Sequence, residues 1–482
     1  MNTRKNCLMK SAIGLCTVLT FLAGCNEGGR ISQTTQASID TAIQTAESDP
    51  LDRYSASDYT GKTFRVLAAS DWRNTLNIFQ YPTEAHAGDI VDDALLKRDR
   101  MLCEHFGITI EYTDVDDLEI YAALQKGVMA NDFPIDMILG SVNLVFAPAV
   151  SSELLYNLAE LPMLDLSAPW WDKHTKQDFM INGKIFGAGG SITTRTVVAP
   201  FAMFFNNTVL TQNSLPSPYS YVKDGTWTID RLYTMISGLA KDIDNNGKWD
   251  SDDAYGLAVE TGGEYAFFTA AEGRVTHNIG GVPEYCYQSE RNIALIQKLG
   301  DLLSNPNVMP HKNYQTYDAN KMFREDRTLF LCAAICDMTL LRDMDSDFGI
   351  VPYPKYDESQ ENYYSGANYW IGTIAMIPVT VENPDFAGTL TDAMAAVSHT
   401  VSMPAEYELS LQVKQTRDAE SAEMLQLICE NVTWDWGEFY GLGGVAADIL
   451  DAITNKRDIT SKLASHEKQA NAAMEKFLTL YQ

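Results

Sequence analysis

The residues between 242 and 253 have the types and spacing of a calcium-binding loop. The segment reads DIDNNGKWDSDD, which matches the D-x-D-x-N-G start of such loops. Carboxylate, amide and carbonyl oxygens at alternate positions are the ligands that Ca²⁺ prefers. The candidate ligands are Asp242, Asp244, Asn246, the Lys248 carbonyl, Asp250 and Asp253. We expect a structural ion, since nothing nearby in the sequence resembles a reactive centre.

One position departs from the usual pattern of this loop. The twelfth residue is Asp253, where such loops normally carry a glutamate that binds with both oxygens. The shorter side chain reduces the reach toward the ion. The alternative interpretation is an acidic loop that closes through Asx turns and holds no metal.

Tryptophans next to polar residues form a second group of candidates. A flat ring covers the C–H face of a sugar, while a neighbouring carboxylate or amide bonds its hydroxyl groups. Each of these rings could instead belong to the core. The better ligand candidates are Trp72, Trp370, Trp434 and Trp436, whereas Trp170, Trp171 and Trp227 are expected to serve packing.

Sequence signatures of catalysis are missing from the chain. It contains no H-E-x-x-H and no G-x-S-x-G, and its seven histidines have no ligand spacing. A pair of glycosidase carboxylates stays possible, because 64 acidic residues leave many pairs open. We expect a protein that is not an enzyme and needs no catalytic cofactor.

Length and charge narrow the function further. The chain has 482 residues, more than one hydrophobic core usually serves, so two lobes are expected. Its 36 Lys and Arg against 64 Asp and Glu give a formal net charge of −28. A surface this acidic repels phosphate backbones, which argues against nucleic-acid partners.

The N-terminus has the features of an export signal. Positive residues precede the short apolar run 12–22, which is too short to span a bilayer, and Leu-Ala-Gly-Cys25 follows. This ending is similar to the bacterial lipobox, and the resemblance implies cleavage after residue 24 and acylation of Cys25. Two or more acyl chains suffice for a stable membrane anchor. Residues 25–58, rich in Ser, Thr, Ala and Gln, are expected to be a flexible tether.

Apolar periodicity beyond the tether predicts alternating strands and helices. Such alternation is typical of a parallel α/β sheet, in which ligands sit beyond the carboxyl ends of strands. The predicted strands are 63–69, 108–112, 135–139, 184–186, 197–206, 327–335, 348–352 and 369–378. The predicted helices are 92–106, ended by Gly107, 118–129, one capped by Thr228, 292–303, 387–397 and one at the C-terminus.

Polar side chains at the ends of the predicted strands are the remaining ligand candidates. Asp71 and Trp72 follow the first strand, and Ser141 and Asn143 follow the third. Asp337 follows the buried strand that ends at Ile335. Each of them could equally be a loop-packing residue.

Several strings, in this order, resemble bacterial extracellular solute-binding proteins of family 1, the lipid-anchored receptors of ABC importers that are related to maltodextrin-binding proteins. The strings are PIDMILGS from 134, LLYNLAELPMLDLSAPWW from 154, INGKIFGAG from 181, FFNN from 204, DGTWT from 224, MDSDFGIVPYPKYDESQENYY from 344 and YW from 369. Each string alone is weak, but their order is specific. The resemblance covers nearly all of residues 60–482.

This resemblance implies a two-lobed, type II periplasmic-binding-protein fold with a solute between the lobes. Residues 59–165 and 347–400 would form the first lobe, and residues 166–346 and 401–482 the second. The family implies hinge closure on a solute, here a carbohydrate, and delivery to a membrane permease. We expect a monomer on the extracellular face of the bacterial membrane.

Three alternatives stay open from the sequence. The solute could be a peptide, a polyamine or another polar molecule. The chain could also be a secreted enzyme that acts on glycans, or a sensor subunit that feeds a membrane kinase.

Overall fold

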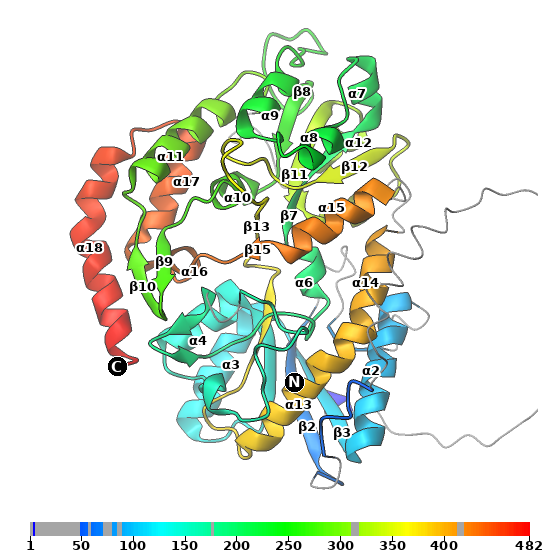
Figure 1. Ribbon diagram of the computed structural model, residues 1–482, viewed down its shortest axis with the longest axis vertical. Coiled ribbons are helices and arrows are strands. Elements are labelled where there is room, and N and C mark those ends of the chain that lie inside the picture. Colours follow the sequence, from blue (N-terminus) through cyan, green and yellow to red (C-terminus); the bar gives the residue numbers. More distant parts are fainter. Residues whose placement is uncertain are drawn as a thin grey trace, which may run out of the picture.

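Two β-sheets, each flanked by helices, form two lobes that are connected by a narrow waist (Figure 1). The computed structural model describes residues 3–4, 49–55, 59–70, 80–83, 89–174, 178–309, 318–411 and 419–482. The predicted lipidation site Cys25 and the candidates Asp71 and Trp72 lie outside these residues.

The first sheet has five strands in the order β1-β3-β2-β4-β14. Strand β2 lies parallel to β3 and β4, whereas β14 lies antiparallel to β4. The strands are β1 (Thr3–Arg4), β2 (Thr63–Ala69), β3 (Thr109–Val115), β4 (Met137–Ser141) and β14 (Thr373–Met376). Helices α2 (Ile90–Phe106) and α3 (Asp117–Ala130) connect the parallel strands, which confirms the predicted alternation.

Local signals define the ends of helix α2. The Asp89 side chain accepts a hydrogen bond from the Val91 N–H, which satisfies one of the free donors of the first turn. Gly107 ends the helix at φ 64°, a left-handed conformation that glycine adopts without steric cost. Leu102 and Phe106 are fully buried against Phe64 of β2.

The second sheet has the order β12-β7-β11-β8. Strand β11 lies parallel to β8, and β7 lies antiparallel to both of its neighbours. The strands are β7 (Phe201–Asn206), β8 (Tyr255–Val259), β11 (Thr328–Ala334) and β12 (Phe348–Val351). Its helices are α7 (Asn207–Gln212), α8 (Pro218–Lys223), α9 (Ile229–Ile236), α10 (Gly263–Ala270), α11 (Glu290–Leu303) and α12 (Asp318–Arg324).

Two sequence predictions differ from this arrangement. Strand β12 lies in the second sheet, whereas the sequence placed all of 347–400 in the first lobe. The sequence could not decide between the sheets, because the short apolar run of β12 fits either of them. The pairing with β7 is a long-range contact that the sequence does not reveal. The predicted strand 197–206 begins instead with helix α6 (Arg195–Val198), which lies at the waist (Figure 1).

Short segments cross between the lobes at the waist. Strands β13 (Ser365–Gly366) and β15 (Val432–Thr433) form a parallel pair there, as Figure 1 shows. A bridge between Pro200 and Ala367 adds the segment after α6 to this pair. Short backbone pairs of this kind suit a hinge, because few residues need to change conformation.

The C-terminal helices are divided between the lobes. Helices α13 and α14 pack on α2 of the first lobe, while α15 packs on β12 and α17 on α11 of the second. The sequence assigned 401–482 to the second lobe, so α14 differs from that expectation. The bounds are α13 (Pro384–Thr400), α14 (Ser402–Leu411), α15 (Ala419–Glu430), α16 (Trp436–Phe439), α17 (Val445–Asn455) and α18 (Thr460–Thr479).

Helix α18 runs beside both lobes at the edge of the molecule (Figure 1). Phe477 of this helix and Tyr481 just after it join a core cluster with Phe186 of the first lobe. The remaining short elements include α4 (Ala147–Ser151), the pair β5 (Met180–Ile181) and β6 (Lys184–Ile185), and the hairpin β9 (Thr276–Ile279) and β10 (Val282–Tyr285).

Part of the expected tether is folded. Leu51 and Tyr54 are buried in the core of the first lobe. The Tyr54 hydroxyl donates to Asp392 Oδ2 at 2.7 Å. The prediction of a flexible tether up to residue 58 is therefore wrong for residues 49–55, because two large apolar side chains fix that segment to the lobe.

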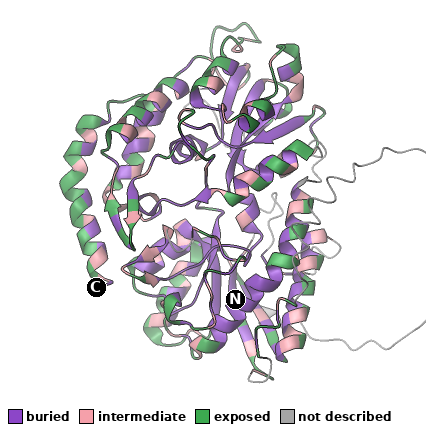
Figure 2. Ribbon diagram, in the orientation of Figure 1, coloured by how far each residue is buried: buried purple, intermediate pink, exposed green. Residues whose placement is uncertain are grey.

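Burial follows the layered arrangement. Figure 2 shows that both sheets are buried and that the outer helices expose one face. The five cysteines after Cys25 are not disulfide-bonded; Cys332 and Cys336 are buried, while Cys103, Cys286 and Cys429 are half-buried. Within the described residues, no helix has the length and apolar character needed to cross a bilayer.

Candidate functional site

A cavity of about 460 Å³ lies at the waist and is lined by both lobes. This volume falls in the range that is usual for small-molecule sites, roughly 300–1,000 Å³. His174 and Asp178 reach it from the first-lobe side, and Thr433, Trp434 and Trp436 from the crossing segment. The second lobe contributes Glu272, Arg274, Thr276, His277, Asn278, Arg291 and Tyr364.

The β9–β10 hairpin brings three polar residues to the cavity. Its turn is Gly280–Gly281, with φ 62° and 92°, so both positions favour glycine. The Asn278 amide donates to the Met180 carbonyl at 2.8 Å, and the Gly281 carbonyl accepts from the Asn182 N–H at 2.7 Å. The hairpin of the second lobe thus contacts the first lobe directly beside the cavity.

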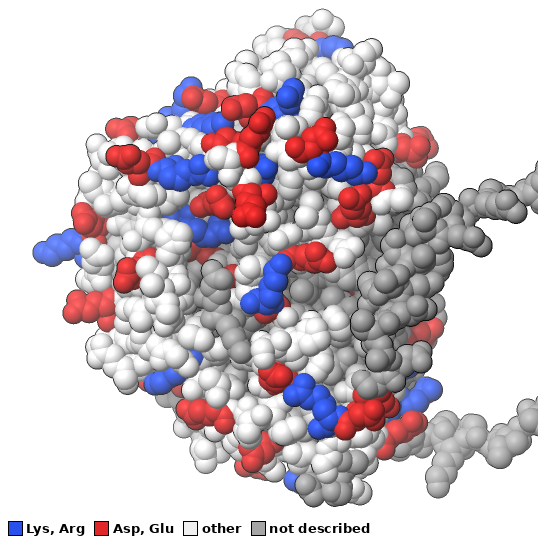
Figure 3. Space-filling view, viewed as in Figure 1, with Lys and Arg blue, Asp and Glu red and all other residues white. Residues whose placement is uncertain are grey.

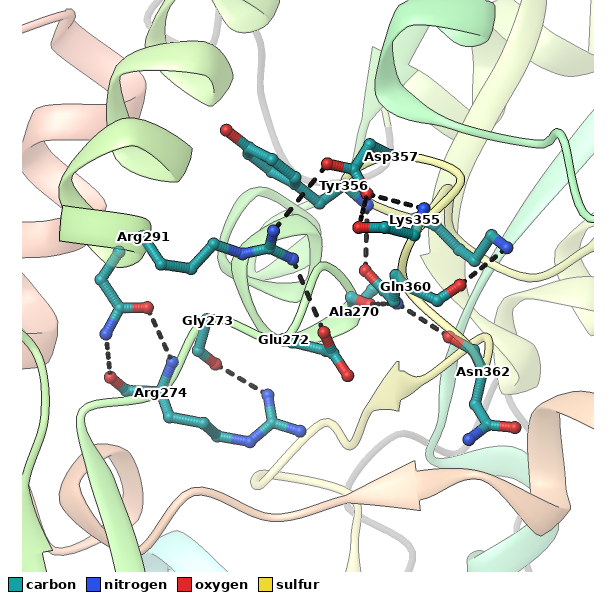
Figure 4. A network of polar contacts seen from close by, with 12 residues as sticks. Ala270, Glu272, Gly273, Arg274, Arg291, Lys355, Tyr356, Asp357, Gln360 and Asn362 are labelled. Carbon is teal, nitrogen blue, oxygen red and sulfur yellow. Dashed lines mark hydrogen bonds and ion pairs between the residues drawn. The ribbon is translucent and has the colours of Figure 1, made fainter. Parts of the chain in front are cut away.

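The turn after α10 carries Arg274. Its Nη1 donates to the Gly273 carbonyl at 2.7 Å (Figure 4) and to the Thr269 carbonyl at 2.8 Å. Its Nη2 donates to Thr433 Oγ1 at 3.1 Å. The last bond joins the second lobe to the crossing segment. The guanidinium also lies 5.9 Å from the centroid of the Tyr364 ring.

A buried glutamine holds the loop that precedes Tyr364. Gln360 Nε2 donates to the Ala270 and Asn362 carbonyls at 2.9 and 2.8 Å, and its Oε1 accepts from the Tyr356 N–H at 3.0 Å (Figure 4). Every polar atom of this amide side chain is therefore bonded. The loop is fixed to the end of α10 and holds Tyr364 at the cavity.

Trp434 forms the boundary between the lobes. Its ring stacks on Tyr369 with centroids 5.6 Å apart. Its Nε1 donates to Asp172 Oδ2 at 3.2 Å, and its backbone N–H donates to Asp178 Oδ2 at 3.1 Å. The ring also lines a second cavity of about 350 Å³ on the other side of the crossing segment.

Asp435, the next residue, fastens the crossing segment to the hairpin. Its carboxylate accepts from the Val275, Thr276 and Gly437 N–H groups and from Thr276 Oγ1. The side chain is buried, and burial raises the pKa of Asp435 despite these bonds. Four donors on one carboxylate make this a rigid joint.

Two acids, Asp178 and Glu272, line the cavity. Burial raises the pKa of Asp178 to about 7, against the opposing effects of the Trp434 N–H and of Arg274. Burial also lowers the pKa of His174. Glu272 is exposed, whereas Arg274 and Arg291 are half-buried. The lining combines aromatic faces, hydrogen-bonding groups and two guanidinium groups, which suits a polar solute that also has apolar faces.

Two of the sequence candidates meet at this cavity. Trp434 and Trp436 both line it, although Trp436 is only 2% exposed and packs edge-on against Tyr440 and Phe477. Among the tryptophans expected to serve packing, Trp171 and Trp227 are buried.

The other described candidates lie elsewhere. Ser141 is fully buried and caps the turn Val142–Phe146 by accepting from the Leu144 N–H at 3.3 Å. Asn143 follows it at the carboxyl end of β4. Asp337 is buried in the turn Ile335–Leu341 of the second lobe. Trp370 is 47% exposed and lines none of the described cavities around the waist.

Sequence reasoning missed most of the polar lining. His174, Asp178, Arg274 and Arg291 belong to no quoted string, Tyr364 ends one of them, and tertiary contacts bring all five together. The Gly280–Gly281 pair is a hairpin signal that could have pointed to the β9–β10 residues.

The calcium-like loop lies apart from the cavity, between α9 and β8. Carboxylate oxygens of Asp242, Asp244 and Asp253 lie within 4.8 Å of one another. Asp242 Oδ1 is buried and has no hydrogen-bond partner among the described residues. Gly247 adopts φ 72° at the turn, and its N–H donates to Asp242 Oδ2 at 2.9 Å. This donor set fits a hard cation.

Comparison with known proteins identifies the family. Residues 100–399 match the sequence profile described as bacterial extracellular solute-binding protein. Because this match spans more than half of the chain, the protein belongs to that family. No curated protein sequence is significantly similar to the chain.

Solved structures share the fold. A cyclo/maltodextrin-binding protein complexed with maltotetraose aligns with a TM-score of 0.60 at 13% identity, over 88% of this chain and 100% of that one. The ABC substrate-binding protein of Listeria monocytogenes in complex with cycloalternan gives 0.57 at 11%, over 86% and 99%. The cyclic α-maltosyl-1,6-maltose binding protein of Arthrobacter globiformis gives 0.57 at 15%, over 86% and 99%. The fold is therefore the two-lobed α/β fold of solute-binding proteins.

Proposed function

We propose that the chain is the solute receptor of an ABC importer and that it binds a carbohydrate in the cavity at the waist. The cavity lined by both lobes carries this proposal, because a solute that touches both lobes favours their closed arrangement. The fold neighbours are described as proteins that bind malto-oligosaccharides and cyclic glucans, which supports a sugar.

Aromatic and hydrogen-bonding side chains would share the recognition of the sugar. Trp434 and Tyr364 are the stacking residues that we favour, while Asn278 would bond hydroxyl groups. Asp71 and Trp72, after β2, stay candidates for the first-lobe side. The role is binding without turnover, so no catalytic cofactor is required.

Anchoring and delivery complete the proposal. Acylation of Cys25 would hold the chain, as a monomer, on the outer face of the bacterial membrane, and the closed form would dock on the permease subunits. The folded segment around Leu51 and Tyr54 would then leave only residues 26–48 as the connection between lipid and lobe.

A structural Ca²⁺ in the loop Asp242–Asp253 is a separate proposal. The three clustered carboxylates and the unbonded Asp242 Oδ1 support it. Asn246, the Lys248 carbonyl and Asp250 would complete the ligands. The ion would fix the loop between α9 and β8 and would take no part in solute binding, because none of these residues lines the cavity at the waist.

The receptor proposal is tested by adding oligosaccharides to the purified protein while recording its tryptophan fluorescence and melting temperature. We expect one class of saccharide to change both, since a ligand at a hundred times its Kd stabilises the fold by about 2.7 kcal/mol. Chromatography of the recovered saccharide should show it unchanged. Consumption of the saccharide would establish a glycan-active enzyme instead.

A further inference from the structure

Two arginines stand on the second-lobe wall of the cavity. Arg274 follows α10, and Arg291 belongs to the first turn of α11 (Figure 4). Both are half-buried and both line the cavity, so their guanidinium groups are available to a bound solute.

Arg274 is held by neutral oxygens. Three of its five N–H groups donate to the Thr269 and Gly273 carbonyls and to Thr433 Oγ1. Within the described part of the chain it forms no ion pair, and two N–H groups have no partner. The nearby carboxylate of Asp435 is occupied by backbone N–H groups and by Thr276. The guanidinium is thus positioned by hydrogen bonds to neutral oxygens, and two of its N–H groups stay free for a solute.

Arg291 is only loosely paired. It stacks on Tyr356 at 3.9 Å, while its nitrogens lie 3.5 Å from Glu272 and 4.0 Å from Asp357. A charge-assisted hydrogen bond to a carboxylate measures about 2.7–2.9 Å. Other arginines of this chain reach that kind of contact, as in Arg98–Asp99 at 2.8 Å and Arg327–Glu325 at 2.6 Å. An anion between the lobes could replace the two long contacts of Arg291.

The charge of the cavity contrasts with that of the molecule. The chain carries −28, and acidic side chains accompany most basic ones on the face in Figure 3. The cavity lining has two arginines and two acids, of which Asp178 has its pKa raised by burial to about 7. The lining thus has as many arginines as acids, inside a chain in which acidic residues far outnumber basic ones.

We propose that the solute of this cavity is an anionic saccharide whose carboxylate or sulfate group is bound by Arg274 and Arg291. The inference rests on the receptor function proposed above and specifies its substrate class. A guanidinium matches both kinds of oxyanion in the same forked geometry. A neutral saccharide would offer no anionic oxygen to either guanidinium group when closure removes water from the cavity.

Isothermal titration of the purified full chain tests the proposal with three tetrasaccharides. Maltotetraose is neutral, tetragalacturonate carries carboxylates, and a carrageenan tetrasaccharide carries sulfates without carboxylates. Each is titrated into the wild type and into Arg274→Gln, Arg291→Gln and Arg291→Lys variants. Arg457→Gln is the matched control, since Arg457 lies in the second lobe away from the cavity and the same charge is removed. Melting curves show whether each variant is folded.

The expected result is binding of one of the two anionic saccharides, with a Kd that rises with salt. Each Arg→Gln change in the cavity should weaken that binding by about tenfold or more. Arg291→Lys should retain part of the affinity, and Arg457→Gln all of it. The anionic arm that binds identifies the carboxylate or the sulfate as the group recognised.

Two other outcomes overturn the inference in different ways. Maltotetraose bound as tightly as the anionic saccharides, with no loss in the two Arg→Gln variants, would refute the anionic substrate and leave the receptor function standing. If none of the three saccharides gave a binding heat, the proposal of a carbohydrate receptor would itself be refuted.

Discussion

Tyr364 offers the simplest test of solute recognition at the scale of one side chain. It is half-buried at the cavity and is held by the loop that Gln360 fixes. We expect Tyr364→Ala to weaken saccharide binding by about two- to tenfold, the value of one aromatic contact. Tyr233→Ala removes a ring that is exposed on the second lobe away from this cavity, and it should leave the Kd unchanged. Equal Kd values for both variants would remove Tyr364 from the site.

Asp178 should make stability depend on pH. Burial raises its pKa to about 7 in the folded chain, from about 3.9 when unfolded. Between these values the folded state binds a proton that the unfolded state has released, so stability falls as pH rises toward 7. We expect Asp178→Asn to reduce this fall, measured as the unfolding free energy at pH 5 and pH 8. Glu119→Gln, on the exposed face of α3, is the control and should keep it. If the unfolding free energy of Asp178→Asn depended on pH as that of the wild type does, the raised pKa of Asp178 would be contradicted.

The sequence could single out candidates only where one residue type carries the signal. Trp434 and Trp436 were chosen because a tryptophan beside a carboxylate is unusual by itself, and both line the cavity at the waist. Arg274 and Arg291 were missed because an arginine gives no signal in the sequence by itself. Only the folded structure shows that they line the cavity and which carboxylates lie near them. Ser141 and Asn143 do follow a strand, as predicted, but the turn that begins with Ser141 uses its hydroxyl as a cap.

At the scale of elements, Asp435 is the joint between the crossing segment and the β9–β10 hairpin. Asp435→Ala would leave buried N–H groups without acceptors, and we expect it to lower the unfolding free energy by about 2–4 kcal/mol. Asp435→Asn keeps one acceptor oxygen and should cost less. Urea unfolding measures both, with the exposed Asp458→Ala as control. If Asp458→Ala lowered the unfolding free energy as much as Asp435→Ala, the role of Asp435 as a joint would be contradicted.

The calcium-like loop, residues 242–253, is the second element whose role can be tested by itself. Chelation of Ca²⁺ should lower the melting temperature of the wild type and leave saccharide affinity unchanged, because the loop lies outside the cavity. Asp242→Asn and Asp253→Asn should abolish the response to chelator. Asp345→Asn, an acid in another loop, should keep it. A melting temperature that does not respond to Ca²⁺ or chelator in the wild type would show that the acidic loop holds no ion.

Apolar periodicity predicted most helices and strands, but few of the elements against which they pack or pair. Helices α2, α3 and α13 and strands β2, β4 and β11 follow their apolar patterns closely. Strand β12 was assigned to the wrong lobe because its run Phe-Gly-Ile-Val is apolar throughout and fits either sheet. The folded segment at Leu51 and Tyr54 was missed because two apolar residues in a polar stretch form no period.

At the scale of the whole molecule, the account requires the two lobes to approach each other around a solute. The segments that cross the waist are short, and the hairpin already contacts the first lobe beside the cavity. We expect the radius of gyration, measured by small-angle X-ray scattering, to decrease when a bound saccharide is added. An unchanged radius at saturating ligand would contradict hinge closure.

The fold neighbours and the family membership explain why the sequence resemblance was informative at the scale of the molecule. The ordered short strings identify an architecture, whereas the cavity's chemistry depends on residues that only tertiary contacts bring together. The architecture was therefore predictable, and the two arginines of the cavity lining were not.

The most direct test of the central claim is isothermal titration of the purified chain with saccharides, followed by chromatography of the recovered ligand. The account predicts saturable binding of one saccharide class at one site per chain, with the saccharide unchanged. Absence of binding by any saccharide, or conversion of the saccharide to products, would contradict a carbohydrate receptor.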